Sequence, residues 1–227
     1  MKNDVQNNKL IILGKLAASL AHEIRNPLSA IKLNLGFLEM SANENERERK
    51  ESVSSALEAV DRIQYLIEST LEFSRKNVKD TDLYSLNEIC EQSIEIIHSS
   101  ARRKSLEIKS DFTNNLPDLN ISKNKTTQII LNLLTNAIEA SSRNSQIFIR
   151  TYKNKNNDLV FLEVDDSGCG IKDEDKDKIF TDFYTNKKNG TGLGLSVCKM
   201  LSEELNASIE FESTEGVGTK FIVKFKV

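Results

Sequence analysis

The residues best suited to chemistry in the first part of the chain lie together in the stretch SLAHEIRNPLSAI, residues 19–31. A neutral imidazole such as that of His22 is a nucleophile at neutral pH. A carboxylate beside it, here Glu23, raises the nucleophilicity of one ring nitrogen by accepting a hydrogen bond from the other. At about 100° per residue, His22 points roughly 180° away from the apolar side of its helix, and Asn26 lies on the same polar side. Pro27 should kink the helix, because an interior proline costs about 3 kcal/mol and frees a backbone carbonyl. The stretch therefore predicts an exposed, reactive histidine.

The segment TTQIILNLLTNAIEAS, residues 126–141, has the residue types of a buried ligand site on a helix. Most of the helix circumference is apolar, and the polar side chains fall within about 100° of arc: Gln128, Asn132, Thr135, Asn136 and Glu139. A helix of this kind must be largely buried, so its polar stripe should line a cavity. Asparagine carbonyl oxygens are suitable ligands for Mg²⁺.

Two glycine-rich segments could complete a nucleotide site. In DDSGCGI, residues 165–171, an acid at the end of a predicted strand precedes two glycines that allow close backbone approach. Asp166 could accept a hydrogen bond from an exocyclic amine, such as that of adenine. In NGTGLGLSVCKM, Gly190, Gly192 and Gly194 precede a helix whose N–H groups and dipole favour an anion. The second segment is neither a P-loop nor a dinucleotide fingerprint, and each segment taken alone is as consistent with a turn.

The elements that position the histidine are two long amphipathic helices. Apolar residues recur every three or four positions from Leu10 to about Met40, and the pattern resumes from Val53 to Leu71. The polar break SANENERERK separates the two runs, which predicts a helical hairpin. Two helices cannot bury both apolar stripes, so a second copy should complete a dimeric four-helix bundle.

RKNVKD, residues 75–80, is the predicted linker, with a domain boundary near residue 78. After it, the pattern of long helices gives way to alternating helices and short strands. Strand patterns appear in SLEIKSDF, QIFIRTY, LVFLEV, SIEFES and TKFIVKFKV, and helices are predicted at 86–103, 122–141 and 192–206. These elements predict an α/β sandwich with an antiparallel or mixed sheet. The charged run EDKDK, residues 174–178, is predicted to be solvated surface.

Composition narrows the function classes. The 227 residues include 31 Lys and Arg against 34 Asp and Glu, so no overall field favours nucleic acid. The three cysteines have no metal-binding spacing, which suits a reducing compartment, and no apolar run approaches the roughly 20 residues of a membrane span. We expect a cytoplasmic protein whose signal comes from a sensory or regulatory partner or from a segment outside this chain.

In their order along the chain, these motifs closely resemble those of the histidine kinases of two-component signalling. AHEIRNPL is similar to their H box, QIILNLLTNAIEAS to the N box, DDSGCGI to the first glycine box, IFTDFYTNK to the F box and GTGLGL to the second glycine box. The resemblance runs from about Leu13 to Val227. It implies an α+β protein in which residues 1–77 form a dimerisation and histidine phosphotransfer domain. Residues 81–227 would form a catalytic ATP-binding domain of the Bergerat type.

The resemblance also implies roles for single residues. His22 would be the phosphoacceptor that attacks the γ-phosphate of ATP, Glu23 its activating base, and Lys187 a basic lid residue near the terminal phosphate. Asn136 would be the principal Mg²⁺ ligand. The nucleotide would be held by Asn132, Asn136, Asp166, Gly168, Gly170, Phe180, Thr191, Gly192, Leu193, Gly194 and Leu195. The phosphoryl group would pass from His22 to an aspartate of a response regulator receiver domain, and Asn26, in an HExxN pattern, is associated with dephosphorylating that partner.

Three other functions compete with this interpretation. ATPases with the same nucleotide fold, such as gyrase and the heat-shock chaperones, carry a glutamate base one turn before the metal asparagine, where this chain has Asn132. An anti-sigma type serine kinase would lack the histidine hairpin. A pseudokinase scaffold should have eroded catalytic motifs, and these are intact.

Overall fold

The computed structural model describes residues 24–38, 46–74, 81–182, 184–187 and 192–227. The chain divides into two compact units, a helical one of residues 1–75 with 187–191, and a mixed α/β one of residues 76–186 and 192–227. The linker predicted at residues 75–80 lies outside the described residues.

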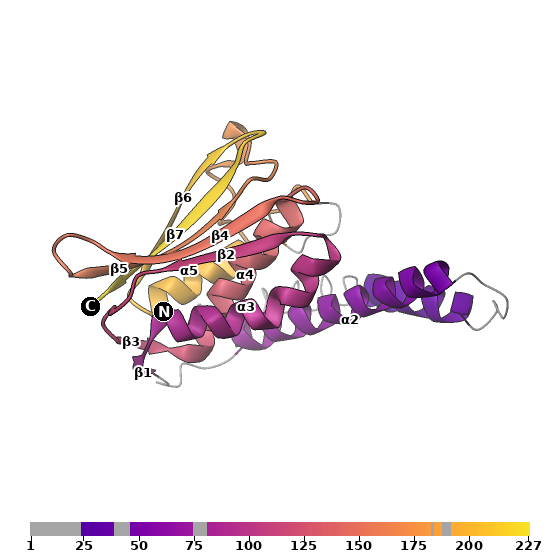
Figure 1. The fold of residues 1–227 in the computed structure, drawn as a ribbon, viewed down its shortest axis with the longest axis horizontal. Helices are drawn as coiled ribbons and strands as arrows, with labels where there is room; N and C mark the ends of the chain where they lie inside the picture. Colours follow the sequence, from indigo (N-terminus) through magenta and orange to yellow (C-terminus); the bar gives the residue numbers. More distant parts are fainter. Residues whose placement is uncertain (1–23, 39–45, 75–80, 183, 188–191) are drawn as a thin grey trace, which may run out of the picture. The chain divides into compact units, whose positions relative to one another are not determined.

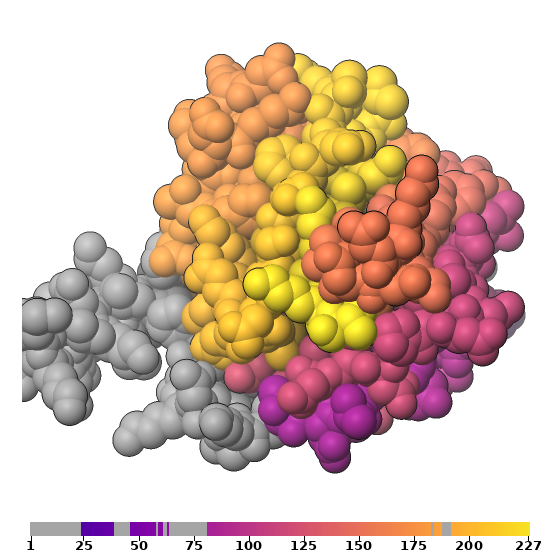
Figure 2. Space-filling view, turned by 90° about the vertical axis from the view of Figure 1, so that its left-hand side faces the viewer, coloured from indigo at the N-terminus to yellow at the C-terminus, as the bar shows by residue number. Residues whose placement is uncertain are grey.

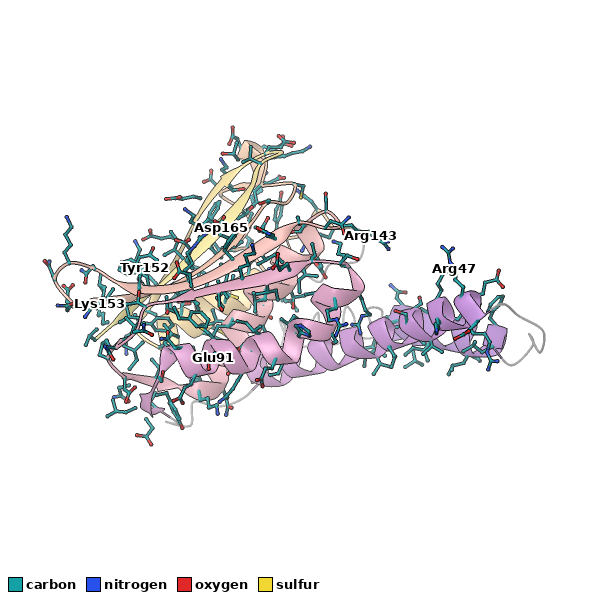
Figure 3. The ribbon with its side chains drawn as sticks, in the orientation of Figure 1. Arg47, Glu91, Arg143, Tyr152, Lys153 and Asp165 are labelled. Carbon is teal, nitrogen blue, oxygen red and sulfur yellow. The ribbon has the colours of Figure 1, made fainter. Side chains whose placement is uncertain are left out.

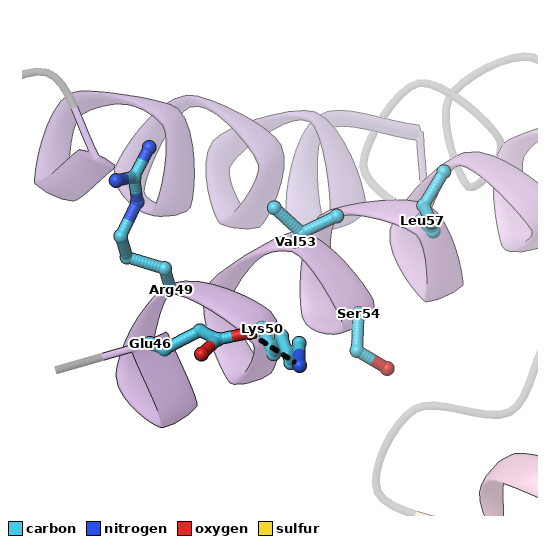
Figure 4. Close-up of a pocket in the computed structure, with 6 residues that line it drawn as sticks. All are labelled: Glu46, Arg49, Lys50, Val53, Ser54 and Leu57. Atoms are coloured by element: carbon cyan, nitrogen blue, oxygen red, sulfur yellow. Dashed lines mark ion pairs between the residues drawn. The ribbon is translucent and has the colours of Figure 1, made fainter.

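The helical unit contains two helices that run side by side, residues 24–38 and α2, Glu46–Ser74 (Figures 1 and 4). α2 begins within the sequence predicted as a polar break, so the break is shorter than expected. Salt bridges one turn apart explain this early start, with Glu46 paired to Lys50 at 2.7 Å and Arg47 to Glu51 at 3.1 Å. Glu46 and Glu48 also lie in the first turn, where the helix dipole favours acids.

The described part of the hairpin leaves a large apolar surface uncovered. On α2 the small residues Ser52, Ala56 and Ala59 are buried, whereas the neighbouring side chains of Val53, Leu57 and Val60 remain 46%, 52% and 42% exposed. Val53 and Leu57 also line a shallow groove together with charged residues from the start of α2 (Figure 4). In the first helix, Leu28 and Leu35 are 56% and 55% exposed. A single hairpin therefore does not bury its own apolar stripes, as the periodicity predicts.

The second unit is built on a five-stranded mixed sheet with three helices on one face (Figure 1). The strand order is β2-β4-β5-β7-β6; β2 is parallel to β4 and all other pairs are antiparallel. The strands of this sheet are β2, Glu107–Phe112; β4, Gln146–Lys153; β5, Leu159–Asp166; β6, Ser208–Thr214; and β7, Gly218–Lys226. The helices are α3, Leu86–Arg103; α4, Lys123–Ala140; and α5, Gly194–Glu204. This confirms the α+β class and the mixed sheet.

The sequence patterns did not predict two further features of this unit. β1, Thr81–Tyr84, and β3, Leu119–Ser122, form a separate antiparallel pair, and η1, Asp173–Asp175, is a single 3₁₀ turn. Strands of four residues are too short to show a clear period-two pattern.

Burial and capping explain where the helices lie. α4 is apolar on most of its surface, and Ile129, Ile130, Leu133 and Leu134 are completely buried, which confirms the prediction of a largely buried helix. Ser122 caps the start of the helix, because its hydroxyl accepts a hydrogen bond from the Lys125 N–H at 3.3 Å.

The opposite face of the sheet carries a polar and aromatic network. Tyr152 on β4 and Asp165 on β5 both belong to it (Figure 3). Arg150 donates to Glu163 and, at 3.1 Å, to Asp165, while the Tyr152 hydroxyl donates to Glu163 at 3.3 Å. The Tyr152 ring stacks on Phe161 with centroids 4.9 Å apart. The network pairs the buried carboxylate of Glu163 and strengthens the β4–β5 pair, at whose end Asp166 lies.

Candidate nucleotide site and phosphoacceptor helix

The two N-box asparagines have different environments on α4. Asn132 is completely buried; its amide N–H donates to the Gly194 carbonyl at 3.2 Å, and its carbonyl accepts from the Gln128 amide at 3.3 Å. Asn136, one turn further on, is only half-buried. Asn132 therefore joins α4 to the start of α5, and Asn136 is the asparagine whose side chain is more accessible.

Asp166, the last residue of β5, is held in place by the loop that follows it. The carboxylate is 7% exposed and accepts a hydrogen bond from the Gly168 N–H at 2.8 Å. A Cβ on Gly168 would come within 2.7 Å of the backbone of Ala140, so only glycine allows α4 and this loop to approach so closely. Thr219 on β7, 6% exposed, lies directly opposite Asp166 in the β5–β7 pair.

Backbone contacts also fix the second glycine of the DDSGCGI loop. Gly170 has φ +67°, a left-handed conformation that side chains disfavour, and a Cβ there would lie 2.1 Å from the Thr214 carbonyl oxygen. The Gly216 N–H donates to the Cys169 carbonyl at 2.8 Å. The loop therefore packs directly against the end of the β6–β7 hairpin, and Figure 2 shows the orange residues that follow β5 beside the yellow hairpin.

Two side chains form hydrogen bonds next to this loop: Ser213 bonds to the loop and the β6–β7 hairpin, and Lys104 bonds to the end of α4. The Ser213 hydroxyl accepts from the Ile171 N–H at 2.9 Å, donates to the Gly218 carbonyl at 2.9 Å, and lies 2.8 Å from the Thr219 hydroxyl. The Lys104 ammonium donates to two carbonyls in the last turn of α4, at 2.7 and 2.9 Å. The sequence patterns did not predict Ser213 or Thr219, because Ser213 acts on Ile171, 42 residues away, and no local pattern marks either residue.

The second glycine box forms the start of α5. Gly192 has φ +69°, and Leu193, 8% exposed, immediately precedes the helix, which begins at Gly194. The Leu193 carbonyl accepts from the Val197 N–H at 2.9 Å, and Leu195 packs against the core. The N–H groups of the first turn of a helix have no partner within that helix, so this end suits an anion. Thr191 lies outside the described residues.

The segment between the two glycine boxes is anchored at several points. The Phe180 ring meets the Phe211 ring of β6 edge-on, with centroids 5.9 Å apart. The prediction that EDKDK is solvated surface is wrong at Asp175, which is 7% exposed and accepts hydrogen bonds from the Tyr184 hydroxyl and the Asn186 amide. Lys187, which follows, is exposed.

His22 and Glu23 lie outside the described residues, but the helix they precede is described from residue 24. Asn26 and Ser29 are exposed, as the predicted polar stripe requires, and Pro27 is buried within the helix. The other histidine, His98, is exposed on α3.

The thiols of Cys90 and Cys198 are buried, and that of Cys169 is exposed. Burial raises the pKa of the Cys198 thiol to about 12 despite a hydrogen bond with Asn132, so the thiol stays protonated at neutral pH. Among the described residues, no group of three or more His, Cys, Asp or Glu side chains could hold a metal ion. No helix within the described ranges is long and apolar enough to cross a bilayer.

Two family models match the chain. The His Kinase A (phospho-acceptor) domain matches residues 12–79, and the model described as Histidine kinase-, DNA gyrase B-, and HSP90-like ATPase matches residues 122–227. The signal transduction histidine-protein kinase AtoS of Escherichia coli is 31% identical over 217 residues, which are 95% of this chain and 35% of AtoS. The sensor histidine kinase ZraS of Salmonella typhimurium is 32% identical over 96% of this chain and 46% of its own length. The chain thus spans between a third and a half of these curated relatives.

Solved structures give the same result. The catalytic domain of the histidine kinase ThkA is 30% identical, with a TM-score of 0.58 over 64% of this chain and 95% of that one. A crystal structure of ThkA in complex with the response regulator protein TrrA has a TM-score of 0.71 and 27% identity, covering 97% of this chain and 63% of that one.

Proposed function

Because this chain belongs to the two-component sensor histidine kinases, we propose that it transfers the γ-phosphoryl group of ATP to His22, and from there to an aspartate of a response regulator. The observation that carries the proposal is the buried carboxylate of Asp166, fixed beneath two backbone-packed glycines at the end of β5. The same chain also carries the AHEIRNPL motif with His22. A nucleotide site and its acceptor in one chain are what autophosphorylation requires.

The residues of the second unit suit an adenine nucleotide. A carboxylate has capacity for more than one hydrogen bond, so Asp166 can accept from the adenine amine while it holds the Gly168 N–H. Gly168 and Gly170 let the loop after Asp166 pack on the backbone of Ala140 and Thr214, which would shape the base pocket. The phosphates would meet Gly192, Gly194 and the intervening backbone at the start of α5, together with Thr191 and the basic side chain of Lys187.

The donor set also suits Mg²⁺ that arrives with the nucleotide. The described residues offer no acidic cage, whereas Mg²⁺ bound to ATP is typically held by one or two protein oxygens plus phosphate oxygens. The half-buried amide of Asn136 can supply such an oxygen. When bound, the ion neutralises charge on the transferring phosphoryl group. Asn132 would support the site indirectly, because its hydrogen bond to the Gly194 carbonyl fixes the start of α5.

The first unit suits self-association and partner docking. The apolar side chains left exposed on both helices of the hairpin would be covered by a second copy in a four-helix bundle. The ThkA–TrrA complex supports a receiver domain as the acceptor of the phosphoryl group. We expect the protein to act in the cytoplasm, under a sensory or regulatory partner or segment.

Hydrolysis of ATP as the main activity is disfavoured by the geometry of Asn132. The corresponding base of the related ATPases must take a proton from water. Here an amide occupies the position, is completely buried and donates to a backbone carbonyl. An amide cannot act as this base.

Incubation with Mg²⁺ and γ-labelled ATP tests the proposed activity. The label should be acid-labile and alkali-stable, as expected for phosphohistidine, and should be lost in His22→Ala. His98→Ala is the matched control, because His98 is an exposed helical histidine outside the motif, and it should label like the wild type. Label that persists in His22→Ala would overturn the assignment.

Asn26 gives a specific reason to test a second activity. It is exposed and follows His22 by four residues in the sequence, so its amide could orient a water toward a partner's aspartyl phosphate. Asn26→Ala should spare much of the autophosphorylation and slow the decay of the phosphorylated regulator in the presence of kinase and ADP. If the wild-type protein does not accelerate that decay, the protein lacks the phosphatase activity.

A further inference from the structure

Residues 171–186 lie between the two glycine boxes, and the first part of this segment is anchored to β6 at two points. At the beginning, the Ile171 N–H is held by the Ser213 hydroxyl of β6 at 2.9 Å. In the middle, the Phe180 ring packs edge-on against Phe211 of the same strand. A segment fixed in this way cannot be treated as a free tether between two binding motifs.

Asp175 closes the remainder of the segment on itself. Its carboxylate lies in η1 and is 7% exposed, yet it accepts hydrogen bonds from two residues further along, the Tyr184 hydroxyl and the Asn186 amide. The Lys178 ammonium lies over the Tyr184 ring, 6.0 Å from its centroid. The hydrogen bond to Asp175 raises the pKa of the Tyr184 phenol, so at neutral pH this hydroxyl is a donor.

We propose that Asp175 is a positioning residue of the nucleotide site: by accepting from Tyr184 and Asn186 it ties residues 184–186 to η1 and orders the segment that leads to the second glycine box. A buried carboxylate with two donors holds its partners more firmly than an exposed one. Ordering this segment before the nucleotide arrives removes an entropic cost from binding. The proposal rests on the proposed function, because it assigns the loop to the phosphate end of an ATP site.

The position of the loop makes a specific prediction about ligands. The adenine pocket depends on Asp166, Gly168 and Gly170, which are held by α4 and the β6–β7 hairpin. Asp175 and its partners belong to the segment that leads to Lys187. Loss of the loop should therefore weaken binding of the triphosphate and leave binding of adenosine almost unchanged.

Asp175→Asn, Tyr184→Phe and Asn186→Ala test this in the full chain. Calorimetry with ATP and Mg²⁺ should show about five- to tenfold weaker binding for Asp175→Asn, with smaller losses for the other two variants. Adenosine, titrated by nuclear magnetic resonance, should bind as in the wild type. The KM for ATP in autophosphorylation should rise by the same factor as the dissociation constant, with kcat changed less. Asp173→Asn is the matched control, because this acid of the same turn has a side chain that is 96% exposed and pairs with Lys176 on the surface at 2.7 Å.

The outcomes separate this proposal from the proposed function. If the wild type neither binds ATP nor becomes labelled, the proposed function fails. If the wild type does both and the three variants match Asp173→Asn, the positioning role alone is wrong. Equal losses of adenosine and ATP would show that the contacts only stabilise the fold, which also overturns it. Tyr184→Phe and Asn186→Ala keep the test decisive if Asp175→Asn does not fold, since both alter less buried side chains.

Discussion

The two units of this chain differ in how far they bury their apolar side chains and in what forms their proposed sites. The described part of the hairpin keeps apolar side chains at the surface, with Leu57 still 52% exposed, and the proposed phosphoacceptor His22 belongs to its sequence. The nucleotide unit buries Ile129, Leu133 and Leu162 completely and builds its site mainly from close approaches of backbone. The described part of the hairpin therefore leaves apolar surface that a second copy would cover, whereas the nucleotide unit has a core of its own. Substitutions in one unit should leave the main property of the other unchanged.

The largest expected effect is the loss of activity in Asn136→Ala. Removing the proposed metal ligand should lower the rate of labelling by about 100-fold or more, a typical cost when one preorganised polar contact to a reacting group is lost. Alanine favours helix, so α4 should persist. Labelling and sedimentation of the same samples should show an inactive protein with unchanged self-association.

Asn120→Ala is the control for this experiment, since Asn120 is an exposed asparagine on β3 of the same unit. It should label like the wild type. Normal Mg²⁺-dependent ATP affinity and labelling in Asn136→Ala would show that the metal ligand lies elsewhere.

The next effect tests whether backbone approach really builds the nucleotide unit. Gly170→Ala should destabilise it by about 3 kcal/mol, because the new Cβ would lie 2.1 Å from a carbonyl oxygen and φ is +67°. Gly216→Ala shares the positive φ, +76°, but has no heavy atom within 4 Å of the new Cβ, so it should cost only about 1 kcal/mol. Urea denaturation followed by circular dichroism measures both, and equal losses would show that the close approach is unimportant.

Much of this architecture could be predicted from local patterns. α4 shows its burial through an apolar surface interrupted by one polar stripe, and β4, β6 and β7 alternate with period two. The features that were missed depend on distant partners: Ser213 acts on Ile171, 42 residues away, and β1 and β3 are four residues each. Asp175 was mispredicted because its neighbours are charged, and only the fold brings Tyr184 and Asn186 to its carboxylate. Local sequence predicted the motifs, but not the contacts that hold them.

A moderate effect should appear only in the hairpin. Leu57→Ala removes apolar surface that a second copy would cover; about half of the side chain is still exposed, so each copy should lose about 1 kcal/mol. Two copies give about 2 kcal/mol, or roughly a 30-fold weaker dimer. Ser55→Ala, at an exposed polar position of α2, is the control. Analytical ultracentrifugation over a concentration series measures the change, and ATP affinity should stay constant. A monomeric wild-type protein would contradict the proposed bundle.

The smallest effect is expected for Ser213→Ala, which tests a side-chain support beneath the backbone site. The Ser213 hydroxyl accepts from the Ile171 N–H, donates to the Gly218 carbonyl and lies within hydrogen-bond distance of the Thr219 hydroxyl, all within 2.9 Å. Alanine fits the same space but leaves these groups without that partner, at a net cost of about 1 kcal/mol.

This cost should appear as a lower denaturation midpoint and as several-fold weaker binding of ATP, because Ile171 ends the loop that follows Asp166. Ser208→Ala, at the exposed start of the same strand, should change neither quantity. If Ser213→Ala lowers stability but not affinity, the hydroxyl supports the hairpin rather than the loop. Backbone packing at Gly168 and Gly170 would then be sufficient to hold the adenine end of the site. The nucleotide unit would in that case depend on backbone contacts, whereas the proposed chemistry of the hairpin depends on the side chain of His22.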